Sequence, residues 1–467
     1  MKGRGQVHGR LRVLQSVTNI PEGQAYRLSD AERARLEKFL ACGEVPSCIQ
    51  EAMDAYFTKK AGRDWHDPVI MDRIRSAIVA QKDDYWKPHH RRSLKYSSGY
   101  SVLGYLAYHF PVYFMQTQYL LAMLADDGLL KPRMNILDVG TGPGVVPLAI
   151  AEFCSHLDGI SADVFTVERA EEHIEAFLAL RDACVLKGGK VSLKPPIKED
   201  IVAFDSSKIP KEIDLVVFSN VLNEIRGTAG SRAGIVQKVA GRLAPDGSIL
   251  IIEPAEENTA TQLRVLALAL KKEGLTIHSP CTFLHGTNCT PDRCWSFTSQ
   301  QGIRPTRIME TLAASSNEPF RYINTDIKYS YVVLRKDTRT RHACRVPPQS
   351  RVLRLALLHR HVGKRVNVIA AKMSENLGDE KTLMFRVCDG SVEKPVFAVL
   401  PAYHVTPENQ AIVDAPYGTV LALEGILVRY NPAHDAYNLF VSRNTGIRNW
   451  DNPGVSSRQQ EPDPDLQ

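Results

Sequence analysis

Residues 135–144 read Asn-Ile-Leu-Asp-Val-Gly-Thr-Gly-Pro-Gly, and the rest of the chain is interpreted outward from this stretch. A short apolar run ends at Asp138, three glycines alternate with other residues, and a helical run, Val145–Phe153, follows. Glycines allow a sharp turn and let a ligand approach the backbone closely. The N–H groups that begin a helix suit a carboxylate. The stretch therefore predicts a strand, a cofactor loop and a helix of a Rossmann-like sheet.

The spacing of the glycines separates two classes of cofactor loop. A dinucleotide loop would have glycine at position 145, where this chain has Val145. The form Asp-x-Gly-x-Gly-x-Gly instead resembles the first motif of class I methyltransferases, which implies S-adenosylmethionine as the cofactor. A tight turn in an unrelated α/β enzyme is the alternative. The expected cofactor-binding residues of this loop are Asp138, Gly140, Thr141, Gly142 and Gly144.

Two acidic residues follow the next two predicted strands. Glu168 ends the second strand, where an acid can accept hydrogen bonds from both ribose hydroxyls. Asp200 follows the third strand, where the methyltransferase fold usually places a side chain near the adenine. We expect both to bind the cofactor, although Asp200 could equally be an exposed loop acid.

The residues after the fourth strand are the candidates for catalysis. Asn220 is expected to contact the cofactor, and Asn220, Asn223 and Glu224 could orient a nucleophile or accept its proton. Asn and Glu at the start of a helix also serve as caps. The Asn-Pro-Pro-aromatic motif of amine methyltransferases is absent, and Cys281 follows the sixth strand, so we reject it as a nucleophile. Cofactor binding is thus better supported than turnover.

Short apolar runs alternate with helical stretches across the middle of the chain, which is typical of a parallel α/β sheet. Seven strands are expected, the number in a methyltransferase sheet. They are Asn135–Val139, Asp163–Val167, Lys190–Leu193, Asp214–Ser219, Ser248–Glu253, Leu275–Ser279 and Tyr329–Leu334.

The regions on either side have other patterns. The N-terminal part is helical, with predicted helices at Ser29–Leu40, Pro68–Val79 and Val102–Leu124. Near the C-terminus five alternating segments separated by turn residues predict an OB-like β-barrel. The expected domains are a helical region (1–125), a Rossmann-like domain (126–336) with a cysteine insertion (280–300), a basic connector (337–361), the barrel (362–450) and a disordered tail (451–467).

Nine cysteines in a chain without a secretion signal argue against a disulfide framework. Cys281, Cys289 and Cys294 lie close in sequence in a loop rich in Gly, Pro and Asn, so their thiolates could converge on one metal. Cys344 is the expected fourth ligand and His285 the reserve. Zinc, an iron–sulfur cluster and three unrelated cysteines all stay open on spacing alone. The remaining cysteines, including Cys388, are more simply interpreted as buried or incidental thiols.

Positive charge is concentrated rather than spread. The net charge is +6, yet residues 335–365 hold ten Lys and Arg against one acid, Asp337. This asymmetry favours binding to a phosphate backbone. The candidate RNA-binding residues are Arg339, Arg341, Arg345, Arg351, Arg354, Arg360, Lys364 and Arg365. In the predicted barrel, aromatic and basic residues interleave as on single-strand binding surfaces; these are Phe385, Arg386, Tyr430, Tyr437, Phe440 and Arg443. Taken singly, an aromatic residue on a barrel strand is more often part of the core.

With these features assembled, the chain resembles the methyltransferase-like assembly factors of the small ribosomal subunit. The matching features are residues 105–111 (Tyr-Leu-Ala-Tyr-His-Phe-Pro), the loop 137–144, residues 220–224 and the cysteine block with Cys344. The resemblance covers about 90–350 and implies binding to small-subunit rRNA and a four-cysteine [4Fe-4S] cluster. Two departures are notable. His285 lies four residues after Cys281, and the OB-like barrel is not general in the family.

We therefore expect an S-adenosylmethionine-binding factor that binds small-subunit rRNA and assists assembly of the small ribosomal subunit, with methyl transfer left open. One alternative is a small-molecule or protein methyltransferase with structural zinc. Another is a non-catalytic ribosome-binding module. No apolar run reaches about eighteen residues and no secretion signal is evident, so we expect a cytoplasmic protein without a membrane partner. We expect it to be monomeric when it is not bound to the ribosome.

Overall fold

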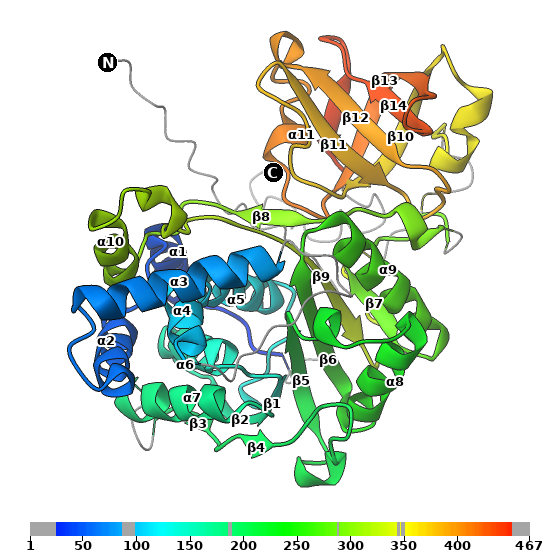
Figure 1. Cartoon of the computed structure of the whole chain (residues 1–467). Coiled ribbons are helices and arrows are strands. Elements are labelled where there is room, and N and C mark those ends of the chain that lie inside the picture. The colour runs from blue at the N-terminus through cyan, green and yellow to red at the C-terminus, as the bar shows by residue number, and fades with distance from the viewer. Residues whose placement is uncertain are drawn as a thin grey trace, which may run out of the picture. The chain divides into compact units, whose positions relative to one another are not determined.

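A computed structural model describes residues 25–85, 99–184, 189–286, 289–342, 346 and 351–450 (Figure 1). These residues form two compact units. The larger unit comprises residues 25–277 and 297–338, and the smaller comprises 278–296 and 339–450. Each unit is described by itself.

The N-terminal region is helical, as predicted, and its described residues form five helices before the sheet. They are α1 (Asp30–Cys42), α2 (Ser47–Ala61), α3 (Pro68–Tyr85), α4 (Ser101–Tyr108) and α5 (Phe110–Asp126), of which α2 was not predicted. Ser29 begins α1 with a capping box in which Glu32 is the reciprocal partner. The single helix predicted over Val102–Leu124 is divided into α4 and α5. Pro111 lies in the first turn of α5, the position where a missing N–H disrupts no helical hydrogen bond.

The large unit is built on one mainly parallel sheet whose strand order is β3-β2-β1-β5-β6-β9-β7. Strand β9 runs antiparallel to β6. All seven predicted strands are present; the short β4 beside β2 and β8 beside β9 were not predicted. The bounds are β1 (Arg133–Val139), β2 (Ser161–Glu168), β3 (Val191–Leu193), β4 (Ile197–Lys198), β5 (Ile213–Ser219), β6 (Leu243–Pro254), β7 (Thr276–Ser279), β8 (Thr298–Gln300) and β9 (Ile327–Arg335).

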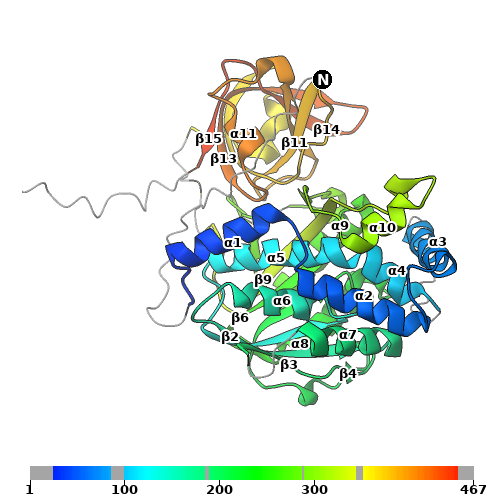
Figure 2. The ribbon, with the colours of Figure 1, turned by 90° about the vertical axis from the view of Figure 1, so that its left-hand side faces the viewer.

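Helices cover both faces of this sheet. Helices α5, α6 and α7 lie on one face, and α8 and α9 lie on the other (Figures 1 and 2). The bounds are α6 (Val145–Ser155), α7 (Glu171–Cys184), α8 (Ala229–Ala240), α9 (Glu257–Lys272) and α10 (Arg307–Ala314). If the short β4 and β8 are left out of the numbering, the strand order is 3-2-1-4-5-7-6, and strand 7 (β9) is antiparallel to strand 5 (β6). This topology confirms the predicted class I methyltransferase fold. None of the described helices is long and apolar enough to span a membrane.

The smaller unit contains a closed five-stranded barrel of order β10-β11-β12-β14-β13, in which β10 also pairs with β13 and a sixth strand, β15, borders β13. Strands β12 and β14 are parallel, and the short helix α11 lies between β12 and β13 in the chain. This confirms the predicted OB-like fold. The bounds are β10 (Arg365–Lys372), β11 (Thr382–Cys388), β12 (Val396–Pro401), α11 (Ala411–Asp414), β13 (Val420–Asn431), β14 (Ala436–Phe440) and β15 (Gly446–Asn449).

Two residues predicted on the surface of the barrel are buried. Phe385 is only 3% exposed and belongs to the apolar core, and Arg386 is 5% exposed. They lie on β11, where Phe385, Arg386 and Val387 are all buried. The prediction that these two side chains form part of a single-strand binding surface is therefore wrong.

The cysteine-bearing segment 278–296 belongs to the smaller unit. The amide of Thr290 donates to the carbonyl of Val392 (3.3 Å) and the amide of Val346 donates to Leu284 (3.4 Å). A Cβ atom on Gly390 would lie 2.6 Å from the Cα of Phe283, so the close packing of this segment on the barrel depends on a glycine there. The segment is thus fixed to the barrel by its backbone.

Candidate functional site

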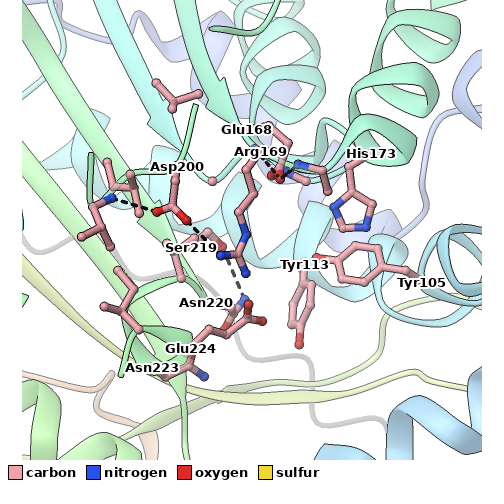
Figure 3. A pocket seen from close by; sticks show the side chains of 18 of the residues that line it. Tyr105, Tyr113, Glu168, Arg169, His173, Asp200, Ser219, Asn220, Asn223 and Glu224 are labelled. Carbon is pink, nitrogen blue, oxygen red and sulfur yellow. Dashed lines mark hydrogen bonds and ion pairs between the residues drawn. The ribbon is translucent and has the colours of Figure 1, made fainter. Parts of the chain in front are cut away.

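A cavity of about 600 Å³ opens at the carboxyl edge of the large sheet, where ligands bind in open α/β folds. Its walls come from the glycine loop after β1, the ends of β2 and β5, and the helices α4 and α5. Figure 3 shows Tyr105 and Tyr113 on one side and Asp200 and Asn220 on the other. The predicted site residues that line the cavity are Gly140, Gly142, Glu168, Asp200, Asn220, Asn223 and Glu224.

Glycines 140 and 144 make room for the protein's own side chains. Gly140 has φ +72°, and a Cβ atom there would lie 2.5 Å from Val221. Gly144 has φ +90°, and a Cβ atom there would overlap the ring of Phe177. Both positions therefore require glycine, because the left-handed backbone and the close neighbour each exclude a side chain. Gly142 has no such close neighbour, and it lines the cavity, as Gly140 also does.

Glu168 joins the end of β2 to the glycine loop. One carboxylate oxygen accepts a hydrogen bond from the amide of Gly142 at 2.8 Å. The other accepts from the amides of Arg169 and Ala170, each at 2.8 Å. The side chain is 8% exposed. Three backbone donors therefore hold this carboxylate in place at the cavity wall, where it was predicted to meet the ribose.

Asp200 lines the same cavity and is more exposed than Glu168. Its carboxylate forms an ion pair with Arg169 at 3.1 Å and accepts from the amide of Val202 at 3.0 Å. Both side chains of the ion pair are largely solvated, so the pair adds little stability. Asp200 thus lies beside the cavity, and its ion-pair partner, Arg169, is largely solvated.

Three predicted cofactor residues lie outside the lining. Asp138 is buried, and its Oδ2 accepts a hydrogen bond from the hydroxyl of Thr141, which is also buried. Burial raises the pKa of Asp138 to about 7; the Thr141 hydrogen bond opposes this and the nearby Glu168 adds to it. Asp138, Thr141 and Gly144 therefore shape the loop without lining the cavity.

Asn220 adopts a backbone conformation that is uncommon for a residue with a side chain. Its φ is +57°, and its amide donates to the carbonyl of Ile252 at 2.9 Å. Asn tolerates this conformation better than most residues, and strained backbone concentrates at functional sites. Asn223 and Glu224 follow in a 3-10 turn, η3 (Leu222–Glu224), and reach the same cavity.

An aromatic wall completes the cavity, and the chemistry of the sequence did not predict it. The rings of His109 and Tyr113 are stacked with centroids 5.8 Å apart, and Tyr105 lies 5.5 Å from His109 and 5.9 Å from His173. Burial lowers the pKa of His109 to about 4, with a smaller effect from Lys82, so this ring is neutral at pH 7. The spacing i, i+4, i+8 of Tyr105, His109 and Tyr113 was the available signal.

The cysteine segment contains three of the four predicted ligands. Cys281, Cys289 and Cys294 are half-buried, and Cys344 lies outside the described residues. Among the described residues, no three Cys, His, Asp or Glu side chains converge as a metal site. The reserve ligand His285 faces Asp389, with Nε2 and Oδ2 3.7 Å apart.

Cys388, interpreted from the sequence as incidental, lies near this segment. Burial raises the pKa of the Cys388 thiol well above its usual range, and the thiols of Cys294 and Cys281 add to this effect. The segment beside these thiols is anchored to the barrel, because Arg293 binds Asp435 at 2.9 Å and the Ser296 and Tyr417 hydroxyls lie 2.6 Å apart. A barrel cysteine is therefore close to two predicted metal ligands.

Most of the predicted RNA-binding residues are accessible. Within the described chain, none of the five exposed ones forms an ion pair. They are Arg351, Arg354, Arg360, Lys364 and Arg365. Arg339 and Arg341 are half-buried. The carbonyl of Arg339 lies 3.3 Å from Nδ1 of His278, and the amide of Arg341 donates to the carbonyl of His278 at 3.0 Å. Arg345 lies outside the described residues.

Two family models match the chain. The model described as "Mitochondrial small ribosomal subunit Rsm22" matches residues 99–376, more than half of the 467 residues. The model described as "Domain of unknown function (DUF8157) C-terminal domain" matches residues 356–450, which contain the barrel. A comparison with curated proteins gave no match.

Solved structures similar to the chain include several methyltransferases. The plantazolicin methyltransferase BpumL with SAH is 14% identical and covers 62% of this chain and 98% of its own, with a TM-score of 0.28. Coclaurine N-methyltransferase, bound to N-methylheliamine and SAH, is 11% identical over 61% and 99%, with a TM-score of 0.31. A SAM-dependent methyltransferase from Aquifex aeolicus is 17% identical over 37% and 87%, with a TM-score of 0.28.

Proposed function

Because the chain belongs to the Rsm22 family, whose model is described as a mitochondrial small ribosomal subunit protein, we propose that it is an assembly factor of the small ribosomal subunit. In this proposal the large unit binds S-adenosylmethionine and the smaller unit binds small-subunit rRNA. The observation that carries the proposal is the cavity between the glycine loop, Glu168 and the aromatic wall. We propose that the protein acts in the cytoplasm, as a monomer when it is not bound to the ribosome.

The residues of the cavity fit S-adenosylmethionine. Its volume of about 600 Å³ lies within the range of small-molecule sites, roughly 300–1,000 Å³. Glu168 offers fixed carboxylate oxygens to the ribose hydroxyls, and the loop at Gly142 lets the ligand approach the backbone. The neutral rings of Tyr105, His109 and Tyr113 suit a positively charged sulfonium, since aromatic faces attract cations.

Methyl transfer is the finer part of the proposal. S-adenosylmethionine would supply the methyl group, and Asn220 at the end of β5 would orient the acceptor. The buried Asp138 and the three amides on Glu168 keep the loop rigid around that position. A non-catalytic module that uses the cofactor only as a structural ligand would leave Asn220 without this role.

The basic connector is the proposed contact with rRNA. Five exposed cations that have no acidic partner among the described residues lie on the smaller unit, and nucleic-acid affinity comes largely from such charges meeting phosphates. The guanidinium group of Arg365 already donates one hydrogen bond within the protein, to the carbonyl of Gly425 at 2.7 Å. The side chains of Arg354 and Arg360 are therefore the better candidates for binding phosphates.

We also propose that Cys281, Cys289, Cys294 and Cys344 hold a [4Fe-4S] cluster, with zinc as the alternative metal. Thiolates are suitable ligands for either metal. The support in the described residues is that the first three lie in one segment fixed to the barrel, and that Cys281 and Cys294 act electrostatically on the half-buried thiol of Cys388. The cluster would then tie this segment to the connector.

Cross-linking in living cells tests the proposal. RNA covalently bound to the tagged full-length protein would be sequenced, and we expect small-subunit rRNA to be enriched over large-subunit rRNA. A double variant, Arg354→Ala with Arg360→Ala, should reduce the enrichment while the protein level is unchanged. Equal recovery of both rRNAs, or of bulk RNA in proportion to its abundance, would overturn the proposal.

A further inference from the structure

A second, smaller cavity lies in the large unit beside the proposed cofactor site. Its volume is about 240 Å³, and it is bounded by η3, the end of β6, the start of α8 and the first turns of α9. Asn223 lines both this cavity and the larger one. A volume below the usual range of roughly 300–1,000 Å³ suits a ligand of one small ring system.

Two residues that line this cavity each hold a buried polar atom that has no partner within the described chain. The atoms are Oδ1 of Asn223, a side chain that is 9% exposed, and Oε2 of Glu253, which is 3% exposed. Buried polar atoms are normally satisfied by a partner, since an unmade hydrogen bond costs about 1–3 kcal/mol. The two atoms therefore indicate a ligand that supplies both bonds.

The donor and acceptor character of these two atoms determines which groups the ligand must offer. Oε1 of Glu253 accepts a hydrogen bond from the amide of Asn223 at 3.2 Å. Burial raises the pKa of Glu253 to about 8, so the carboxyl group is protonated near pH 7. A neutral carboxyl group whose first oxygen accepts can donate from the second. The cavity then presents one donor, from Glu253, beside one acceptor, from Asn223.

The other walls suit a flat ring attached to a phosphate. Leu222, Leu263 and Leu266 supply the apolar part of the wall. Asn258, Thr259 and Gln262 on α9 supply polar groups. Arg232 stands half-buried at the cavity, and its Nε donates to the carbonyl of Ile225 at 3.1 Å, which leaves its terminal nitrogens for an anion. A donor–acceptor pair beside a cation matches a nucleotide.

We propose that this second cavity binds one unstacked base of the bound RNA, with Asn223 and Glu253 hydrogen-bonded to its edge and Arg232 to its phosphate. Every nucleobase has an edge on which a donor adjoins an acceptor, and proteins read extruded bases in this way. The proposal rests on the proposed function only in taking RNA as the source of the base. It places an RNA base across Asn223 from the cofactor cavity.

Binding of nucleoside monophosphates to the full-length protein tests this inference. Saturation-transfer NMR would compare AMP, CMP, GMP and UMP with ribose 5-phosphate, and we expect the base protons of at least one nucleotide to be saturated by the protein. Glu253→Ala should weaken the binding of that nucleotide by about tenfold, which is the scale of one hydrogen bond to a base. Glu253→Gln keeps a donor, so its affinity for the nucleotide should stay within about threefold of that of the natural protein. Arg232→Ala should weaken the binding of the nucleotide but not the binding of the corresponding nucleoside, which has no phosphate.

S-adenosylhomocysteine titrations on the same samples separate this inference from the proposed function. Retained S-adenosylhomocysteine binding in Glu253→Ala shows that the variant is folded, so weaker nucleotide binding then supports the inference. If Glu253→Ala does not fold, the Arg232→Ala and Glu253→Gln comparisons decide the matter. Nucleotides that bind no better than ribose 5-phosphate, or equally well to every variant, would overturn the inference while leaving the proposed function intact. Nucleotide binding without any S-adenosylhomocysteine binding would uphold the inference and overturn the proposed cofactor.

Discussion

The carboxylate of Glu168 accepts a hydrogen bond from the amide of Gly142 at 2.8 Å, which connects the end of β2 to the glycine loop after β1. The same side chain accepts from Arg169 and Ala170, so it orders its own loop as well. One residue therefore shapes two of the segments that meet at the carboxyl edge of the sheet. This is why the cavity depends on Glu168 even before a ligand binds.

Replacing Gly144 with alanine should destabilise the protein more than an equally strained glycine elsewhere. Gly144 and Gly62 both have positive φ, but a Cβ atom meets Phe177 at Gly144 and nothing within 4 Å at Gly62. Backbone strain costs about 1–2 kcal/mol, and overpacking adds about 1–3 kcal/mol. Denaturant unfolding should show a loss near 1 kcal/mol for Gly62→Ala and at least about 2 kcal/mol for Gly144→Ala. Equal losses would mean that the packing against Phe177 is loose.

Glu253 should make stability fall as the pH rises. Its pKa is about 8 in the folded chain, mainly through burial, and 4.5 is the ordinary value. Between these values the unfolded chain releases the proton and the folded chain keeps it, so the free energy of unfolding decreases with pH. Glu253→Gln cannot ionise, and its stability relative to the natural protein should increase across this window. A pH-independent difference in urea unfolding would contradict the raised pKa.

The connector arginines should contribute to RNA affinity by binding phosphates. Replacing Arg354 and Arg360 together with alanine should weaken small-subunit rRNA binding and lower the salt dependence by about one counterion for each phosphate no longer bound. Arg448→Ala is the control, because Arg448 is also exposed on the smaller unit but is paired with Glu424 at 3.3 Å. Filter binding at several salt concentrations would show this. The same slope in both variants would exclude the connector from the interface.

The cysteines should bind iron rather than zinc. Anaerobically purified protein should contain about four irons with sulfide per chain and absorb broadly in the visible range. Cys289→Ser and Cys344→Ser should lose this absorbance, whereas Cys48→Ser, at an exposed position, should retain it. Cys388→Ser tests the nearby barrel thiol, and retained iron is expected there. One zinc in a colourless protein would replace the cluster with a structural zinc site.

Sequence patterns predicted the elements whose signal is long and periodic. Strand β1 and its loop, the seven strands of the sheet and the five strands of the barrel all have clear apolar alternation or runs. Strands β4 and β8 span only two and three residues, too few for any period to be visible. The break before Pro111 and the burial of Phe385 depend on tertiary packing.

The candidate site was predictable where it follows the strands and was not where it comes from elsewhere. Glu168, Asp200 and Asn220 end or follow strands, so their shared edge follows from the topology. The aromatic wall comes from helices α4 and α5, and no rule of sequence places Tyr105 or Tyr113 over that edge. The closeness of Cys388 to Cys294 likewise depends on how the segment packs on the barrel.

Equilibrium binding of labelled S-adenosylmethionine to the full-length protein tests the central claim most directly. We predict saturable binding of one molecule per chain, weakened at least about tenfold by Glu168→Gln, which places an amide group among three backbone donors. Glu171→Gln, an exposed neighbour paired with Lys198, should change the affinity by less than about twofold. Absence of saturable binding to the natural protein, or equal affinity in both variants, would contradict the assignment of this cavity as the cofactor site.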